Sequence, residues 1–97
     1  MATFTATLFR HATAGGWHFV EVPAALAPPV AGHFGMTPVV ATLDGRTWKT
    51  TTWREAAGRV LLPAPKKVRG KKVAGDEVEV EVEADLLRVR DVPRPAR

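Results

Sequence analysis

The chain contains no cysteine, serine, tyrosine, asparagine, glutamine or isoleucine among its 97 residues. Without cysteine, it can form no disulfide and offers no thiolate ligand to a metal ion. Without serine, cysteine and tyrosine, it lacks three side chains that enzymes use as nucleophiles or acids. Without asparagine and glutamine, it has no side-chain amide for an oxyanion hole. We therefore expect a protein that is not an enzyme, with no catalytic residues and no cofactor.

The composition also bears on stability and on location. Heat-adapted proteins carry few of the thermolabile residues Asn, Gln and Cys, so the sequence is consistent with a thermostable protein. Codon bias in a GC-rich genome predicts the same depletion. No apolar run reaches the roughly 20 residues of a membrane-spanning helix, and the first residues lack the basic and apolar regions of a signal peptide. We expect a bacterial-type protein of the cytoplasm with no membrane partner.

A weak internal repeat with an offset of forty residues predicts two related halves. The matched pairs are Val20 and Val60, Pro23 and Pro63, Ala24 and Ala64, Gly35 and Gly75, and Val40 and Val80. Each half is predicted to contain two strands, a short helical stretch and a further strand. The length fits one domain with one core, over residues 1–97, with about 3–92 ordered and 93–97 a frayed tail. Two halves in one chain favour a monomer with pseudo-dimeric halves.

The hydrophobic pattern predicts a mainly β protein with about six or seven short strands. The expected strands cover residues 3–11, 17–22, 36–43, 46–52, 59–62, 77–83 and 86–92. Asp44-Gly45 predicts a type I′ hairpin turn, and residues 53–58 are expected to form a loop. Pro38 predicts an edge strand, or a place among the first residues of its strand.

One or two short helices are expected beside the strands. Pro28-Pro29 disrupts a helix interior, so residues 24–34 are predicted to form a broken helical turn or an irregular connection. A second helix is expected to start at Pro65 and to run through about Lys72, weakened by Gly70. Strands and helices of these lengths predict a small closed or nearly closed β-barrel.

Residues 77–83 give the clearest strand, because three valines alternate with four glutamates. The row of carboxylates could bind a hard cation such as Ca²⁺. The absence of a glycine-containing calcium loop instead favours a solvated face, paired with Lys or Arg on a neighbouring strand. His11, His18 and His33 lack the spacing of a zinc site, and Gly15-Gly16 matches no nucleotide-binding motif. We expect no metal site.

Several short segments, in a fixed order, resemble a known family. They are Gly16-Trp17, residues 20–23, residues 38–45, Trp48 with Thr50-Thr51, and residues 67–69 followed by 75–80. Over about residues 4–92 the chain resembles the bacterial domain-of-unknown-function 1905 family. The resemblance implies the double-split barrel class, in which AbrB- and MazE-like proteins build one barrel from two chains. The chain departs from the family pattern at Pro28-Pro29, and it ends where many relatives continue into a basic helical region.

A basic run precedes the acidic strand in a chain whose net charge is +4. The candidate polyanion-binding residues are Lys66, Lys67, Arg69, Lys71 and Lys72, with Arg46, Trp48 and Arg54 beside them. Cations clustered on a helix suit phosphates, and exposed tryptophans stack on bases. Alternatively, the helix is a solvated element anchored by Val68 and Val73, its charge is balanced by the glutamates, and the three tryptophans belong to the core.

The resembled family has no assigned activity, so three hypotheses follow from the residues alone. The leading hypothesis is an uncharacterised, non-enzymatic binding or accessory module whose partner is unknown. One alternative is nucleic-acid or polyanion binding through residues 66–72. The other is a protein-interaction or small-ligand module that uses a cleft between the halves near Trp17 or Trp48. An enzyme would need a His–carboxylate pair in a pocket, such as His18 or His33 near Glu21 or Asp44.

Overall fold

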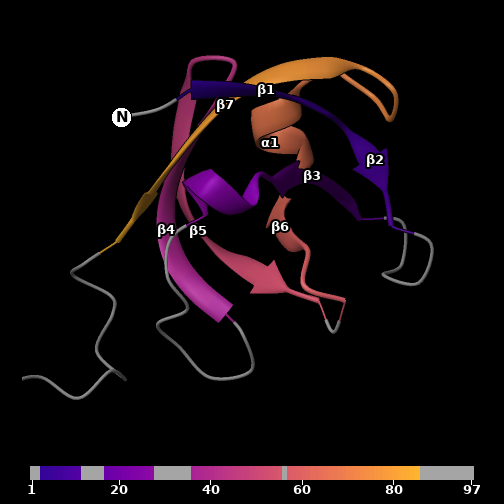
Figure 1. The fold of residues 1–97 in the computed structure, drawn as a ribbon. Coiled ribbons are helices and arrows are strands. Elements are labelled where there is room, and N and C mark those ends of the chain that lie inside the picture. Colours follow the sequence, from indigo (N-terminus) through magenta and orange to yellow (C-terminus); the bar gives the residue numbers. More distant parts are fainter. Residues whose placement is uncertain (1–2, 12–16, 28–35, 56, 86–97) are drawn as a thin grey trace, which may run out of the picture.

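The computed structural model describes residues 3–11, 17–27, 36–55 and 57–85, and it shows one strongly curved antiparallel sheet (Figure 1). The strands are β1 (Thr3–Thr7), β2 (Phe9–Arg10), β3 (His18–Val22), β4 (Met36–Leu43), β5 (Arg46–Arg54), β6 (Val60–Pro63) and β7 (Glu77–Ala84). A 3-10 turn, η1 (Ala24–Leu26), and one helix, α1 (Lys66–Arg69), complete the elements. Within the described ranges, neither helix is long and apolar enough to cross a membrane. The predicted mainly β fold is confirmed.

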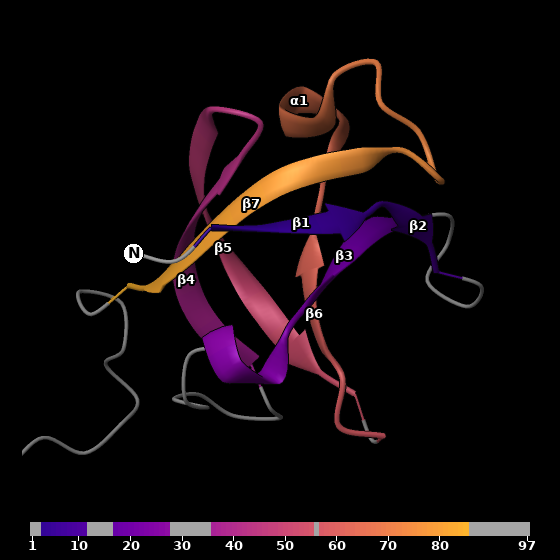
Figure 2. The same ribbon diagram turned by 45° about the horizontal axis from the view of Figure 1, so that its top comes forward.

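The sheet curls into a nearly closed barrel. Its seven strands follow the order β1-β7-β4-β5-β6-β3-β2, and every neighbouring pair is antiparallel. The two outer strands of this order, β1 and β2, are consecutive in the chain with only Leu8 between them. The sheet therefore returns on itself, and in Figure 2 β1 lies between its partner β7 and β3, which it also contacts.

The order of elements agrees with the two predicted halves, but the strand register does not agree with the predicted offset of forty residues. The run β1–β2, β3, η1 and β4 is followed by β5, β6, α1 and β7, so both halves read strand, strand, helix, strand. However, Val40 lies opposite Glu83 on the outer face, whereas Val80 lies opposite Leu43 in the core. Residues forty positions apart therefore do not occupy equivalent places in the last strand of each half. Neighbouring residues of a strand face opposite sides, so an offset that is wrong by one residue matches a buried side chain with an outward one.

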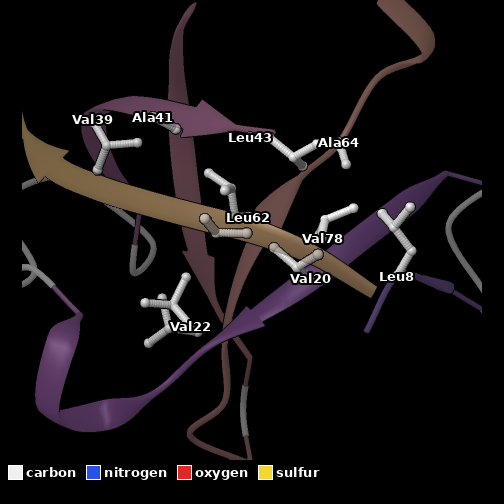
Figure 3. Packing of buried hydrophobic residues seen from close by; sticks show 11 residues of the cluster. Leu8, Val20, Val22, Val39, Ala41, Leu43, Leu62, Ala64 and Val78 are labelled. Carbon is white, nitrogen blue, oxygen red and sulfur yellow. The ribbon is translucent and has the colours of Figure 1, made fainter. Parts of the chain in front are cut away.

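The core fills the barrel with side chains that alternate along the strands (Figure 3). The largest contributions come from Leu8, Val20, Leu43, Leu62 and Val80, which are all 1% exposed or less. Each Val or Leu that leaves water stabilises the fold by roughly 1.5–3 kcal/mol. The predicted inward face of the 77–83 strand is confirmed, since Val78 and Val80 are buried and their neighbouring glutamates face outward.

The β4–β5 hairpin confirms the turn prediction. Asp44 has φ 48° and Gly45 has φ 86°, as a type I′ turn requires. Asp44 also joins the hairpin to β7, because its backbone N–H donates to the Glu79 carbonyl and its Oδ1 accepts from the Glu79 N–H, both at 2.9 Å. Pro38 lies near the start of β4, as predicted, but β4 is central. The regular ladder with β7 begins at the next residue, Val39, and the Pro38 carbonyl still accepts from the Asp85 N–H at 2.9 Å.

Two segments differ from the predicted strands and loops. Residues 3–11 form two strands instead of one, because Leu8 leaves the ladder and bonds to the 75–76 turn, with its N–H donating to Asp76 O at 2.9 Å. The run can then pair with β7 before the break and with β3 after it. Trp53 and Arg54 belong to β5 instead of a loop, because they pair with Leu61 and Val60.

The second predicted helix is shorter than expected, and the short strand after residue 58 is shifted by one residue. α1 ends at Arg69, because Gly70 follows with φ 61°, outside the helical region. β6 covers Val60–Pro63 where residues 59–62 were predicted. The predicted strand 86–92, the tail 93–97 and the connection after residue 27 lie outside the described residues, as does His33.

Replacing Leu62 should test the core directly. Its side chain is fully buried in the centre of the barrel, so Leu62→Ala should lower the free energy of unfolding by roughly 2–5 kcal/mol. Urea unfolding followed by circular dichroism gives the value. Leu26→Ala, in the half-exposed η1 turn, is the matched control and should cost much less; equal losses would contradict the described core.

Candidate binding groove

β5 and β6 separate along their length, and the separation creates a groove. β5 pairs with β6 only at Trp53 and Arg54, whereas β6 continues along β3 as far as Pro63. In Figure 2 the two strands meet near the hairpin that joins them and diverge towards α1. A hollow of about 630 Å³ lies here. We call it the tryptophan groove, and the residues that define it are Trp17, Trp48, Lys49, Trp53, Lys67 and Arg69.

The three tryptophans of the chain all line this groove. Trp17 is 59% exposed and Trp53 is 47% exposed, so the prediction that the tryptophans are core residues is wrong for these two. Trp53 faces outward because Thr52, its neighbour in β5, faces the core opposite Thr37. Trp48 is half-buried and packs against the core cluster. The groove therefore has an aromatic wall that solvent reaches.

The charge of the groove is of one sign. Lys49, Lys67 and Arg69 line it, and no described Asp or Glu does. Arg69 donates from Nη1 to the carbonyl of Lys72 at 3.0 Å, while its buried Nε has no hydrogen-bond partner among the described residues. An unsatisfied buried donor costs free energy, more so on a charged group.

The structure divides the predicted basic run. Lys67 and Arg69 reach the groove, as does Trp48, whereas Lys66 and Lys71 are exposed outside its lining. Lys72 instead forms an ion pair with Asp44 at 3.4 Å and donates to the carbonyl of Glu77 at 2.8 Å. Of the five cations in the basic run, two therefore remain candidates for binding in the groove, and the other three do not line it.

Arg46 and Arg54 are also separated from the predicted site. Arg46 donates to the carbonyl of Val68 at 3.5 Å and lies against Gly70, where an added Cβ would be 2.9 Å from its Nη1. Arg46 therefore holds α1 against β5 and positions Lys67 and Arg69 without lining the groove. Arg54 lies in a neighbouring hollow.

That neighbouring hollow measures about 330 Å³ and shares Trp17 and Trp53 with the groove. We call it the side hollow; its other lining residues are His11, Phe19, Arg54, Glu55 and Leu61. Phe19 and Leu61 are buried on the outer face of the barrel, outside the main core cluster. This second apolar layer was not predicted from the sequence. The apolar run Val60-Leu61-Leu62 was the available signal, because consecutive apolar residues in a strand need cover on both faces.

A charged network closes one side of the side hollow. Glu55 Oε2 lies 3.0 Å from His11 Nε2, and Glu55 Oε1 accepts from Arg59 Nε at 2.7 Å. The hydrogen bond from Arg59, followed by that from His11, holds the pKa of the Glu55 carboxyl below its usual value of 4.5. The same bond raises the pKa of Arg59. A His–carboxylate pair thus lies in a hollow, formed by His11 and Glu55. The examples of such a pair expected from the sequence were His18 or His33 with Glu21 or Asp44, and His33 lies outside the described residues.

In the described part of the neighbouring strands, no cation lies opposite the row of glutamates on β7. Its register partners on the outer face are Thr3, Thr5 and Thr7 of β1 and Val40 and Thr42 of β4. The predicted pairing with Lys or Arg on a neighbouring strand is therefore wrong, because the flanking strands carry threonine and valine at these positions. No group of three or more His, Asp or Glu in the described ranges is placed to hold a metal ion.

The Glu55 network predicts a pH-dependent contribution to stability. Because the folded-state pKa of Glu55 is lowered, its carboxylate stabilises the fold above about pH 4.5, and the contribution is lost as the pH falls through the folded-state value. Glu55→Gln should be less stable than the parent near neutral pH and equally stable in acid. Thermal unfolding over a pH series measures this, with the exposed Glu83→Gln as control; a pH-independent difference would contradict it.

Comparison with known proteins gives a family and no activity. No curated protein matches the chain. The model of a family described as a domain of unknown function, DUF1905, matches residues 4–82. The matched region runs from β1 into β7 and includes the tryptophan groove and the side hollow. The double-split class remains a prediction. The resemblance noted in the sequence is confirmed, and the chain belongs to the DUF1905 family.

Proposed function

We propose that this protein is a non-enzymatic binding module that holds single-stranded nucleic acid in the tryptophan groove. One observation carries the proposal: three tryptophans and three cations line one hollow, and no described carboxylate interrupts it. The proposal joins the two sequence hypotheses, because the cleft near Trp17 and Trp48 also contains Lys67 and Arg69 of the basic run.

Unpaired nucleotides match this lining better than a duplex does. Proteins that bind single strands combine a positive groove for the phosphates with aromatic side chains on which bases stack. Trp17 and Trp53 are about half exposed or more, so their rings are accessible to a base. In a duplex, the base faces are stacked on each other and only base edges and phosphates are presented. The aromatic wall would then be unused.

The distribution of charge over the barrel supports the same ligand. The exposed glutamates of β7 are Glu77, Glu79 and Glu83, and β4 separates β7 from β5, which carries Trp48 and Lys49. Glu21 on β3 is also exposed and Glu55 lines the side hollow, but neither lines the tryptophan groove. An anionic chain is attracted to the groove by local charge, although the net charge of the chain is only +4.

The chemistry of the side hollow supports a binding role over catalysis. Glu55 already accepts hydrogen bonds from Arg59 and His11. Its lowered pKa makes it a weak proton acceptor, whereas a general base works best with a pKa near the operating pH. With no serine, cysteine or tyrosine in the chain, the pair has none of these side chains to activate.

Charge reversal at one lysine tests the groove. Lys67 lines it and Lys71, close by in the sequence, does not, so Lys67→Glu and Lys71→Glu make the same change of charge at two places. We expect Lys67→Glu to weaken binding of a labelled ten-nucleotide single strand strongly, and Lys71→Glu to weaken it slightly. The slope of log affinity against log salt should fall by about 0.7 for each phosphate that the variant no longer neutralises. Fluorescence anisotropy at several salt concentrations measures both quantities.

Equal effects of the two lysine variants would place the polyanion contact outside the groove. Binding that does not change with salt would contradict a phosphate ligand altogether. The duplex of the same sequence is the ligand control and should bind more weakly than the single strand.

Removing an exposed ring tests the stacking surface. Trp53→Ala should cost roughly 1–3 kcal/mol of binding free energy, the usual contribution of one base stacked on an aromatic side chain. Trp53→Phe keeps a ring and should retain most of the affinity. Because Trp53 is 47% exposed, both variants should fold, which circular dichroism verifies. Unchanged affinity of the alanine variant would show that bases do not stack there.

A further inference from the structure

The side hollow has the shape and the walls of a site for one flat ring. Trp17 and Trp53 form walls that it shares with the tryptophan groove. Phe19 and Leu61 are buried beneath, and the rings of Trp17 and Phe19 are nearly parallel, with 24° between their planes. Its volume of about 330 Å³ is near the lower end of the roughly 300–1,000 Å³ of small-molecule sites. One ring system fits this size better than a polymer does.

The polar side of the hollow is built differently from the groove. The charged side chains that line the groove are all positive, whereas the side hollow places the carboxylate of Glu55 beside His11 and Arg54. A carboxylate repels a phosphate and accepts hydrogen bonds from N–H groups. The two hollows therefore divide the parts of a nucleotide between them: the groove suits the backbone, and the side hollow suits a base that carries N–H donors.

Glu55 keeps acceptor capacity for such a base. An ionised carboxylate has about four lone-pair sites. Arg59 occupies one site on Oε1 and His11 one on Oε2, which leaves about two. The same two partners hold the carboxylate in place and keep it ionised, because the hydrogen bond from Arg59 and then that from His11 lower its pKa. A fixed, charged acceptor discriminates more strongly than a mobile one, since less conformational freedom is lost on binding.

We propose that the side hollow is a base pocket that prefers a nucleobase with an exocyclic amino group, such as adenine or cytosine, over thymine. The base would stack against Trp17 or Trp53 and donate its amino hydrogens to Glu55, while its phosphates remain with the groove cations. This inference rests on the proposed function, because the pocket continues the same tryptophan wall. It adds a preference among bases, which the groove alone does not supply.

The test compares oligomers that differ only in their bases. Labelled ten-nucleotide strands of deoxyadenosine, deoxycytidine and thymidine are titrated at one salt concentration against the parent, Glu55→Gln and Glu21→Gln. Glu21 is the matched control, because its carboxylate also approaches Arg59, at 3.9 Å, but does not line the side hollow. We expect the parent to bind the adenine and cytosine strands at least about tenfold more tightly than the thymine strand, as one charge-assisted hydrogen bond allows.

Glu55→Gln should reduce that preference to a few-fold and leave the salt slope unchanged, and Glu21→Gln should leave both unchanged. A second measurement uses the parent protein alone, in case the Glu55 variant folds poorly. Tryptophan fluorescence should report binding of free adenosine that is insensitive to salt, and weaker binding of free thymidine.

The outcomes separate this inference from the proposed function. Equal affinity of the parent for the three strands, with a steep salt dependence, would overturn the base pocket and leave the nucleic-acid groove standing. Binding of adenosine without binding of any strand would overturn the proposed function and keep the pocket as a small-ligand site. A preference that Glu21→Gln reduces as much as Glu55→Gln would overturn the assignment to Glu55.

Discussion

The barrel depends on two places where a run of chain leaves the ladder with a neighbouring strand. Residues 3–10 pair first with β7 and then with β3, and β5 pairs along its length with β4 but only at its end with β6. A strand can leave its ladder only where other groups form hydrogen bonds with the backbone N–H and C=O groups that the ladder no longer pairs. Leu8 meets this condition through the 75–76 turn. Where β5 leaves β6, the opening is the tryptophan groove.

The same opening determines which charges face a ligand. α1 is a single turn that Val68 anchors in the protein and Arg46 holds from β5. This attachment directs Lys67 and Arg69 to the groove and leaves Lys72 to pair with Asp44. A run of like charges therefore does not act as one patch. The orientation of the short helix α1 decides which of these cations line the groove and which do not.

In the proposed function, the two hollows have different roles. The groove offers cations and aromatic faces, which would act on any single strand, whereas the side hollow adds a fixed carboxylate that would select among bases. Trp17 and Trp53 belong to both. Trp17 stacks against Phe19 and Trp53 lies opposite Leu61, so these exposed rings flank the outer apolar layer. The same surface is the one that the proposed ligand would meet.

The sequence by itself determined most of the strands, the hairpin and the family. Alternation around Val78 and Val80 determines which face is buried, and Asp44-Gly45 determines its turn, because both depend on neighbouring residues. Only the tertiary structure decided that Trp53 faces solvent and that His11 meets Glu55, 44 residues away. Such contacts depend on where two strands separate and on which distant strand covers each face. The local sequence pattern does not specify these long-range contacts, because they form only when the barrel closes.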